Sequence, residues 1–143
     1  MSRARTIAAF HEAGHVVAAV LLGGQVPVVA IDDGDDGGGR CAIRWPVSAG
    51  DQARREALFV AAGPVAERLR FGSVDAAIVA GDQWCHRQRF REPVDDFGPA
   101  ERVAERLVRA RWGAIARVAA ALSCRRSLTR EDVVRLMVGG GRR

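Results

Sequence analysis

Apolar residues recur along most of the chain at helical spacing. The pattern predicts helices over residues 6–22, 51–71, 82–90, 99–122 and from Thr129 to about Val138. Glycines at 23 and 72 follow the first two segments, as is common at helix ends. Gly63-Pro64 lies inside the second segment and predicts a kink or a break, because proline offers no backbone donor. Thr129 with Asp132 forms a variant capping pattern that opens the last helix.

Two shorter segments have the character of strands. Residues 26–31 are mostly β-branched, and Pro27 near their start suits the edge of a sheet. Residues 40–45 alternate polar or small side chains with Cys41, Ile43 and Trp45, which predicts a half-buried strand paired with the first in a hairpin. The Asp- and Gly-rich residues 32–39 between them are expected to form a turn or mobile loop. We therefore expect a mainly α fold with a small β-hairpin (α+β).

Length and charge narrow the class of protein. The 143 residues suit one domain, which we place over residues 1–138, with a flexible tail over 139–143. The net charge is +5 and the pI about 10.7. The 22 basic residues are all arginine and are interleaved with acids, as in Arg102, Glu105 and Arg106, which is typical of solvated helix faces. The denser arginines of 87–91 could contact phosphates, but the overall spread disfavours nucleic-acid binding as the main function.

The cysteines and the N-terminal segment bear on the compartment. Cys41, Cys85 and Cys124 are odd in number and form no CxxC pair, which argues against a cysteine-rich structural zinc site and favours a reduced, cytoplasmic setting. The N-terminal segment imitates a signal peptide, but His11 and His15 interrupt it. The remaining apolar run, residues 16–22, is too short for a signal peptide or a membrane span.

The strongest chemical signal is the segment His11-Glu12-Ala13-Gly14-His15. Residues four apart share one face of a helix, so the two imidazoles can bind one ion from successive turns. Zn²⁺ accepts such nitrogens at about 2.0–2.1 Å. Glu12 would lie beside the ion, where its carboxylate can take a proton from the attacking water. The segment therefore predicts a zinc site with a general base.

A catalytic zinc site also needs a third protein ligand and one open position. The downstream candidates are Glu67, Asp75, Asp82 and His86, and spacing does not choose among them. Asp82 would equally suit a helix N-cap. His86, four residues later on the same face, could replace Asp82 or hydrogen-bond to it. Glu67 could steady the site or form a solvated ion pair.

Four stretches carry a family resemblance: residues 5–15, residues 61–72, Gly81-Asp82 and residues 126–133. Together they resemble the peptidase domain of the FtsH-type proteases, which are membrane-anchored AAA zinc peptidases. The likeness spans about residues 5–137. It implies a mainly helical, zincin-like domain with a small β-hairpin near the cleft. It also implies His11, His15 and Asp82 as zinc ligands, with Asp82 at the start of its helix, and Glu12 as base. Strand 40–45 would pair with an extended substrate by β-augmentation.

The sequence departs from the family at several points. Gly63-Pro64-Val65 replaces a Gly-Gly-Arg segment, and Gly81 replaces an asparagine. Gly37-Gly38-Gly39 lacks the Lys and Ser/Thr of a Walker loop, so no ATPase motif is recognised, and no transmembrane segment is found. With these departures we do not assume the ring-forming contacts of the family, although an oligomer is possible.

The function expected from the sequence is that of a zinc endopeptidase acting on flexible polypeptides or on polypeptides delivered by a separate unfoldase or adaptor. The alternatives are a non-catalytic zinc-stabilised interaction module and a basic nucleic-acid-binding domain.

Overall fold

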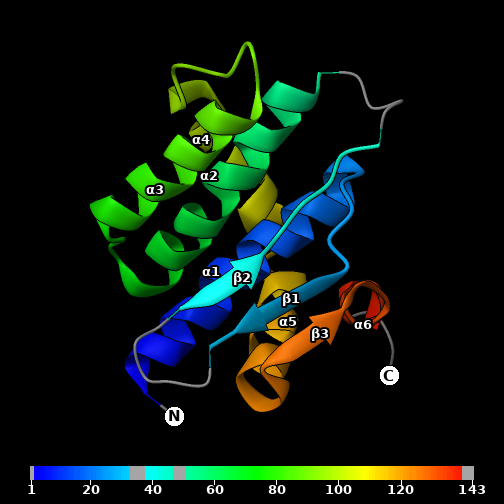
Figure 1. The fold of residues 1–143 in the computed structure, drawn as a ribbon. Helices are drawn as coiled ribbons and strands as arrows, with labels where there is room; N and C mark the ends of the chain where they lie inside the picture. The colour runs from blue at the N-terminus through cyan, green and yellow to red at the C-terminus, as the bar shows by residue number, and fades with distance from the viewer. Residues whose placement is uncertain (1, 33–37, 47–50, 140–143) are drawn as a thin grey trace.

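The computed structural model describes residues 2–32, 38–46 and 51–139. Residues 33–37 of the expected turn and 140–143 of the expected tail lie outside the described residues. The described chain is mainly helical, with a small antiparallel sheet, which confirms the α+β class (Figure 1). In order, the elements are α1 (Arg3–Leu22), β1 (Val28–Ile31), β2 (Gly39–Cys41), α2 (Gln52–Phe71), α3 (Ala76–Arg89), α4 (Gly98–Ala110), α5 (Trp112–Arg125), β3 (Ser127–Thr129) and α6 (Arg130–Val138).

Helix α1 is the centre of the fold. It packs on α2 and α5, and strands β1 and β2 also contact it (Figure 1). Its middle part, residues 11–19, is buried around the whole helix. Its apolar residues surround the helix instead of forming one stripe, as expected for a helix in the interior. The Ser2 side chain caps the start by accepting the Arg5 N–H at 3.2 Å, and Gly23 ends the helix in a left-handed conformation at φ 83°. The predicted helix is confirmed and begins three residues earlier.

The sheet has the order β2-β1-β3, and both pairs are antiparallel. Val29 faces Cys41 in the β1–β2 pair, which confirms the predicted hairpin. Strand β2 is shorter than predicted, and pairing resumes only at an isolated bridge between Gln25 and Arg44. Pro27 lies between the two paired regions and has no N–H for the ladder. The third strand, β3, was not predicted.

Helix α2 runs without a break through Gly63-Pro64, so the predicted break does not occur. Packing against α1 and α4 on either side holds the helix together despite the lost backbone donor. The approach of α1 is very close, since a Cβ on Gly14 would lie 2.5 Å from the Ala62 carbonyl oxygen. The glycine in α1 thus permits the close contact of α1 with α2.

Helix α3 begins at Ala76, six residues before the predicted start. Asp75 caps it by accepting the Ala77 N–H at 2.9 Å, and the alanine-rich residues that follow extend the helix. Asp82 therefore lies in the middle of α3, neither at its start nor at its N-cap. This corrects the placement expected from the resemblance.

The predicted helix 99–122 is divided at Arg111 into α4 and α5. The physical reason is tertiary, because α4 packs on α2 whereas α5 packs on α1, and the chain must change direction between them. The last helix is confirmed, with Thr129 and Asp132 forming a capping box. Among the described residues, no helix combines the length and apolar character needed to cross a membrane.

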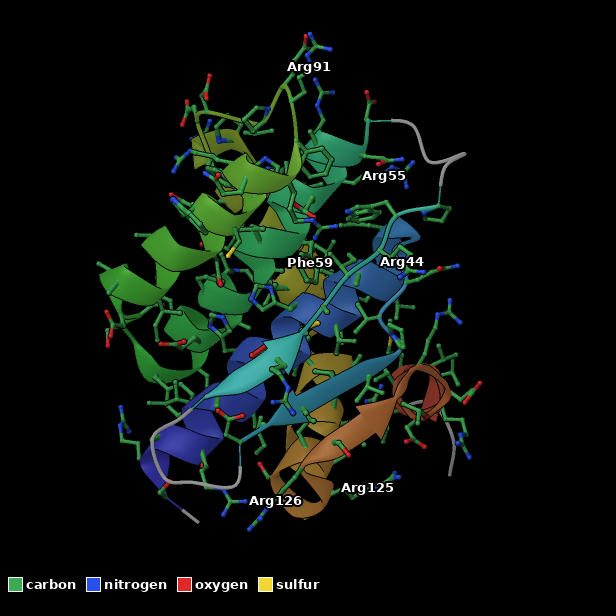
Figure 2. The ribbon with its side chains drawn as sticks, viewed as in Figure 1. Arg44, Arg55, Phe59, Arg91, Arg125 and Arg126 are labelled. Carbon is green, nitrogen blue, oxygen red and sulfur yellow. The ribbon has the colours of Figure 1, made fainter. Side chains whose placement is uncertain are left out.

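Arginines lie on separate parts of the surface. Figure 2 shows Arg91 at one end of the molecule, Arg125 and Arg126 near the other, and Arg44 at the side of the sheet. In this view Arg91, Arg44 and the pair Arg125 and Arg126 lie well apart, which agrees with the interleaved charges seen in the sequence.

Candidate metal centre

Three side-chain atoms converge where α1 faces α3. His11 Nε2 and His15 Nε2 lie 3.0 Å apart, one turn from each other on α1. Asp82 Oδ2, from α3, lies 3.3 Å from the first nitrogen and 3.4 Å from the second. Ligands placed tetrahedrally at about 2.0–2.1 Å from zinc lie roughly 3.3–3.4 Å from each other. The three atoms could therefore hold a metal ion with little change in position.

The other nitrogen of each imidazole determines where its hydrogen lies. His15 Nδ1 donates to the Phe59 carbonyl oxygen at 2.8 Å, and His11 Nδ1 donates to Glu67 Oε1 at 3.0 Å. With hydrogen on Nδ1, each neutral ring turns the lone pair of Nε2 toward Asp82. A hydrogen bond between the two Nε2 atoms would need an additional proton. Two lone pairs and a carboxylate oxygen thus meet in one place, as a cation requires.

Asp82 supplies a further sign that the centre suits a cation. Its buried Oδ2 lies 3.3 and 3.4 Å from the two Nε2 atoms, and with hydrogen on Nδ1 of both neutral rings it receives no hydrogen bond from the described residues. A buried acceptor that receives no hydrogen bond lowers the stability of the fold unless another positive group, such as a cation, binds it. A metal ion on Oδ2 would satisfy this atom and both imidazoles together.

The charges around the site favour a cation. Burial lowers the pKa of His11, but the carboxylates of Asp82, Glu67 and Glu12 outweigh burial and raise it to about 9. Burial raises the pKa of Asp82, yet the two imidazoles hold it well below its usual range. Both shifts have one cause, namely the attraction between a protonated imidazole and the carboxylates around it, and a metal ion in the same place would be attracted in the same way.

Glu12 lies beside the three converging atoms and is not one of them. Its side chain is buried, and burial raises its pKa, while the neighbouring imidazoles act in the opposite direction. Gly39 of β2 covers it so closely that a Cβ there would lie 2.5 Å from Glu12 Oε2. Any larger residue at position 39 would displace the carboxylate.

The site opens into a cleft with a volume of about 440 Å³. Its walls are α1, α2, α3 and the segment from Gly39 to Ile43. Glu12 and the three converging side chains all line it. A ligand that enters this cleft would therefore reach both the candidate metal site and the carboxylate of Glu12.

No family model matches this chain, and no curated protein matches it. The interpretation of the centre therefore rests on its geometry. The group of two histidines and one aspartate is a candidate metal site, and the identity of the metal is open.

The sequence candidates for a third ligand separate clearly. Asp82 joins the histidines, whereas Asp75 caps α3. Glu67 lies behind His11 and holds its Nδ1. His86 is not available as a ligand, because both its nitrogens are engaged, with Glu56 and with the backbone of Val94.

Sequence reasoning missed two residues that hold His15. The Phe59 carbonyl accepts its Nδ1 hydrogen, and no sequence pattern marks a backbone oxygen for that role. A Cβ on Gly63 would overlap the His15 ring. The Gly63-Pro64 pair predicts a kink or a break, and that pattern gives no sign that the glycine provides the space which the imidazole occupies.

Proposed function

We propose that this chain is a zinc-dependent endopeptidase of the FtsH-type, zincin-like class. In this proposal His11, His15 and Asp82 hold the ion, and Glu12 is the catalytic base. The observation that carries it is the convergence of two imidazole lone pairs and a carboxylate oxygen within 3.0–3.4 Å, next to a buried glutamate. Two imidazoles with one carboxylate and an open fourth position form a donor set of catalytic zinc sites.

The chemistry would divide between the ion and Glu12. A bound zinc ion lowers the pKa of a water molecule and polarises the scissile carbonyl. Glu12 accepts the proton that the water loses as its oxygen attacks the carbonyl carbon. Glu12 then gives this proton to the leaving nitrogen as the C–N bond breaks. Because burial raises the pKa of Glu12, its protonated form is more accessible for this second transfer.

The free edge of β2 supports an extended polypeptide as the substrate. Gly38 O accepts the Asp32 N–H at 2.8 Å, so Gly38 turns its backbone groups toward β1. Along an antiparallel strand the backbone N–H and C=O groups of successive residues point alternately to one side and the other. The N–H and C=O groups of Gly39 and Cys41 therefore point away from β1. That side is an edge of the described sheet, and both residues line the cleft. A peptide strand added here would run past Glu12.

The decisive experiment replaces Glu12 with glutamine. We expect Glu12→Gln to keep one zinc ion per chain, measured by elemental analysis, and to lose cleavage of an unstructured, fluorescently labelled casein peptide pool. Removal of the base should lower kcat by about 10²–10⁴-fold. Glu92→Gln is the matched control, since it removes the same charge from an exposed loop and should leave cleavage unchanged.

Two results would contradict the proposal. Cleavage by Glu12→Gln at the parent rate would remove Glu12 from the chemistry. Tight zinc binding by the parent without any peptide cleavage would instead favour a zinc-stabilised interaction module.

A further inference from the structure

A second buried polar group lies in the same cleft and is centred on Glu56 of α2. Glu56 and His86 are each only 1% exposed. Glu56 Oε2 accepts the His86 Nδ1 hydrogen at 2.9 Å. Glu56 Oε1 pairs with the guanidinium of Arg89 and lies 3.4 Å from the donating indole nitrogen of Trp45. One carboxylate thus binds donors from α3 and from the segment that follows β2.

The hydrogen positions in this group are fixed. The Val94 N–H donates to His86 Nε2 at 3.0 Å, so that nitrogen carries a lone pair. The hydrogen of the neutral ring must then lie on Nδ1, which faces Glu56. Buried charged groups of this kind contribute little net stability compared with apolar residues of similar volume. The hydrogen bonds of this group do, however, fix the side chains of Glu56, His86 and Arg89 in one arrangement.

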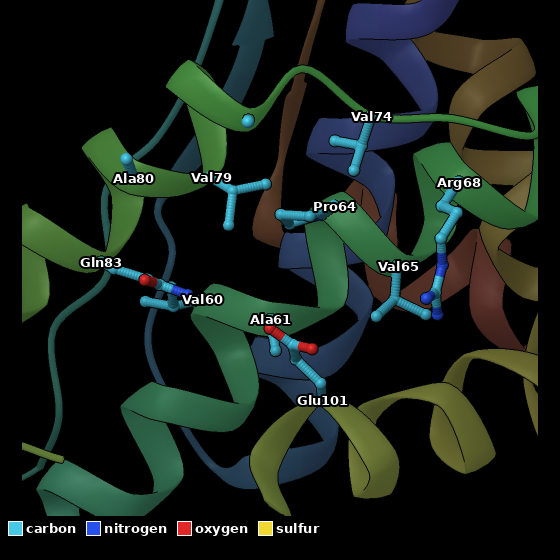
Figure 3. A pocket seen from close by; sticks show the side chains of 11 residues that line it. Val60, Ala61, Pro64, Val65, Arg68, Val74, Val79, Ala80, Gln83 and Glu101 are labelled. Carbon is cyan, nitrogen blue, oxygen red and sulfur yellow. The ribbon is translucent and has the colours of Figure 1, made fainter. Parts of the chain in front are cut away.

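Helix α3 depends on this group because little else holds it. His86 is the only residue of α3 that is buried. Along the first half of α3 a cavity of about 320 Å³ separates the helix from α2 (Figure 3). Figure 3 shows Pro64 of α2 facing Val79 of α3, while Val65 turns toward Glu101 of α4. Close packing, which ordinarily fixes the distance between two helices, is therefore incomplete here.

The same helix carries Asp82. Asp82 lies four residues before His86, so both side chains project from one face of α3. Any movement of α3 at His86 would therefore move the carboxylate that faces the two histidines. At the end of α3, Arg89 reaches across the cleft and donates to the carbonyl oxygen of Ile43 on the facing wall, at 3.1 Å.

We propose that Glu56 is a positioning residue for the metal centre, which through His86 holds α3 where Asp82 can reach the ion. Through Arg89 the same carboxylate holds the facing wall at Ile43. The inference rests on the proposed metal centre and extends it to residues that touch neither the ion nor the substrate.

The test measures zinc affinity instead of activity. In Glu56→Gln the side chain keeps its shape, but the amide has one acceptor oxygen in place of two for the three donors, His86, Arg89 and Trp45. In His86→Phe a ring remains beside Phe90 and Phe97, and both hydrogen bonds are lost. We expect each variant to weaken zinc binding about ten- to hundredfold in competition with a chromophoric chelator. X-ray absorption of zinc-loaded Glu56→Gln should show one protein oxygen ligand replaced by water.

The control is Val133→Ala in α6, a helix that supplies no residue to the cleft. It should lower stability and leave the zinc dissociation constant unchanged. If circular dichroism shows the variants folded and both bind zinc as tightly as the parent, the positioning role of Glu56 is wrong. If His86→Phe does not fold, the isosteric Glu56→Gln decides alone. A parent chain that binds no zinc would instead overturn the metal centre and the proposed function.

Discussion

Replacing Gly63 with alanine tests two opposing effects: a gain in helix propensity and a steric clash with His15 at the candidate metal site. Gly63 lies inside α2, where alanine ordinarily stabilises a helix by about 1 kcal/mol over glycine. Here the added carbon would lie 2.6 Å from both Cδ2 and Cε1 of His15. Carbon atoms in ordinary contact are about 3.5 Å or more apart, so the ring or the helix must move by roughly 1 Å.

The size of that shift determines the expected effect. Metal–ligand distances tolerate changes of only about 0.2 Å, and His15 is held on its other side by the Phe59 carbonyl. We expect Gly63→Ala to weaken zinc binding about ten- to hundredfold, or roughly 1.4–2.7 kcal/mol. Overpacking costs about 1–3 kcal/mol, so it cancels or exceeds the gain in helix propensity.

Gly81→Ala is the matched control, because it is the same change inside α3 with nothing within 4 Å of the added carbon. It should raise the free energy of unfolding by up to about 1 kcal/mol and leave zinc affinity unchanged. Thermal unfolding without zinc and chelator competition with zinc measure the two quantities. If Gly63→Ala gained stability and bound zinc just as Gly81→Ala does, the tight contact with His15 would be refuted.

Two further predictions concern the cleft and the last helix. Gly39→Ala should leave zinc binding intact and reduce kcat at least tenfold, because the new methyl group displaces the Glu12 carboxylate, the proposed base; an unchanged kcat on a fluorescent peptide would contradict this. Asp132→Asn should lower the melting temperature at pH 7. The Thr129 backbone N–H, with smaller contributions from its side chain and Arg125, holds the pKa of Asp132 below its ordinary 3.8 in the folded protein. This stabilisation is present above 3.8 and disappears as the pH falls through the folded-state pKa, so the two melting temperatures should converge in acid. Exposed Asp95→Asn, the control, should show no such convergence.

Much of the fold could be predicted because its signals are local. Glycines and caps marked the ends of α1, α2 and α6, and side-chain alternation marked the β1–β2 hairpin. The errors arose where packing overrides local signals. Pro64 does not break α2, because neighbouring helices hold it, and the chain turns at Arg111 because α4 and α5 pack on different helices. Strand β3 is three residues long and forms through pairing with β1, which no local pattern announces.

The candidate site divides in the same way. The positions of His11, Glu12 and His15 follow from the local sequence, because helical geometry places side chains four residues apart on one face with Glu12 beside them. Spacing leaves Asp75, Asp82 and His86 open, and before the structure only the family resemblance points to Asp82. The fold places Asp82, and neither of the other two, beside the histidines, because that choice depends on how α3 lies on α2. It also brought Glu67 to His11 across 56 residues of chain. Contacts between distant segments depend on packed distances, and no spacing within one segment encodes them.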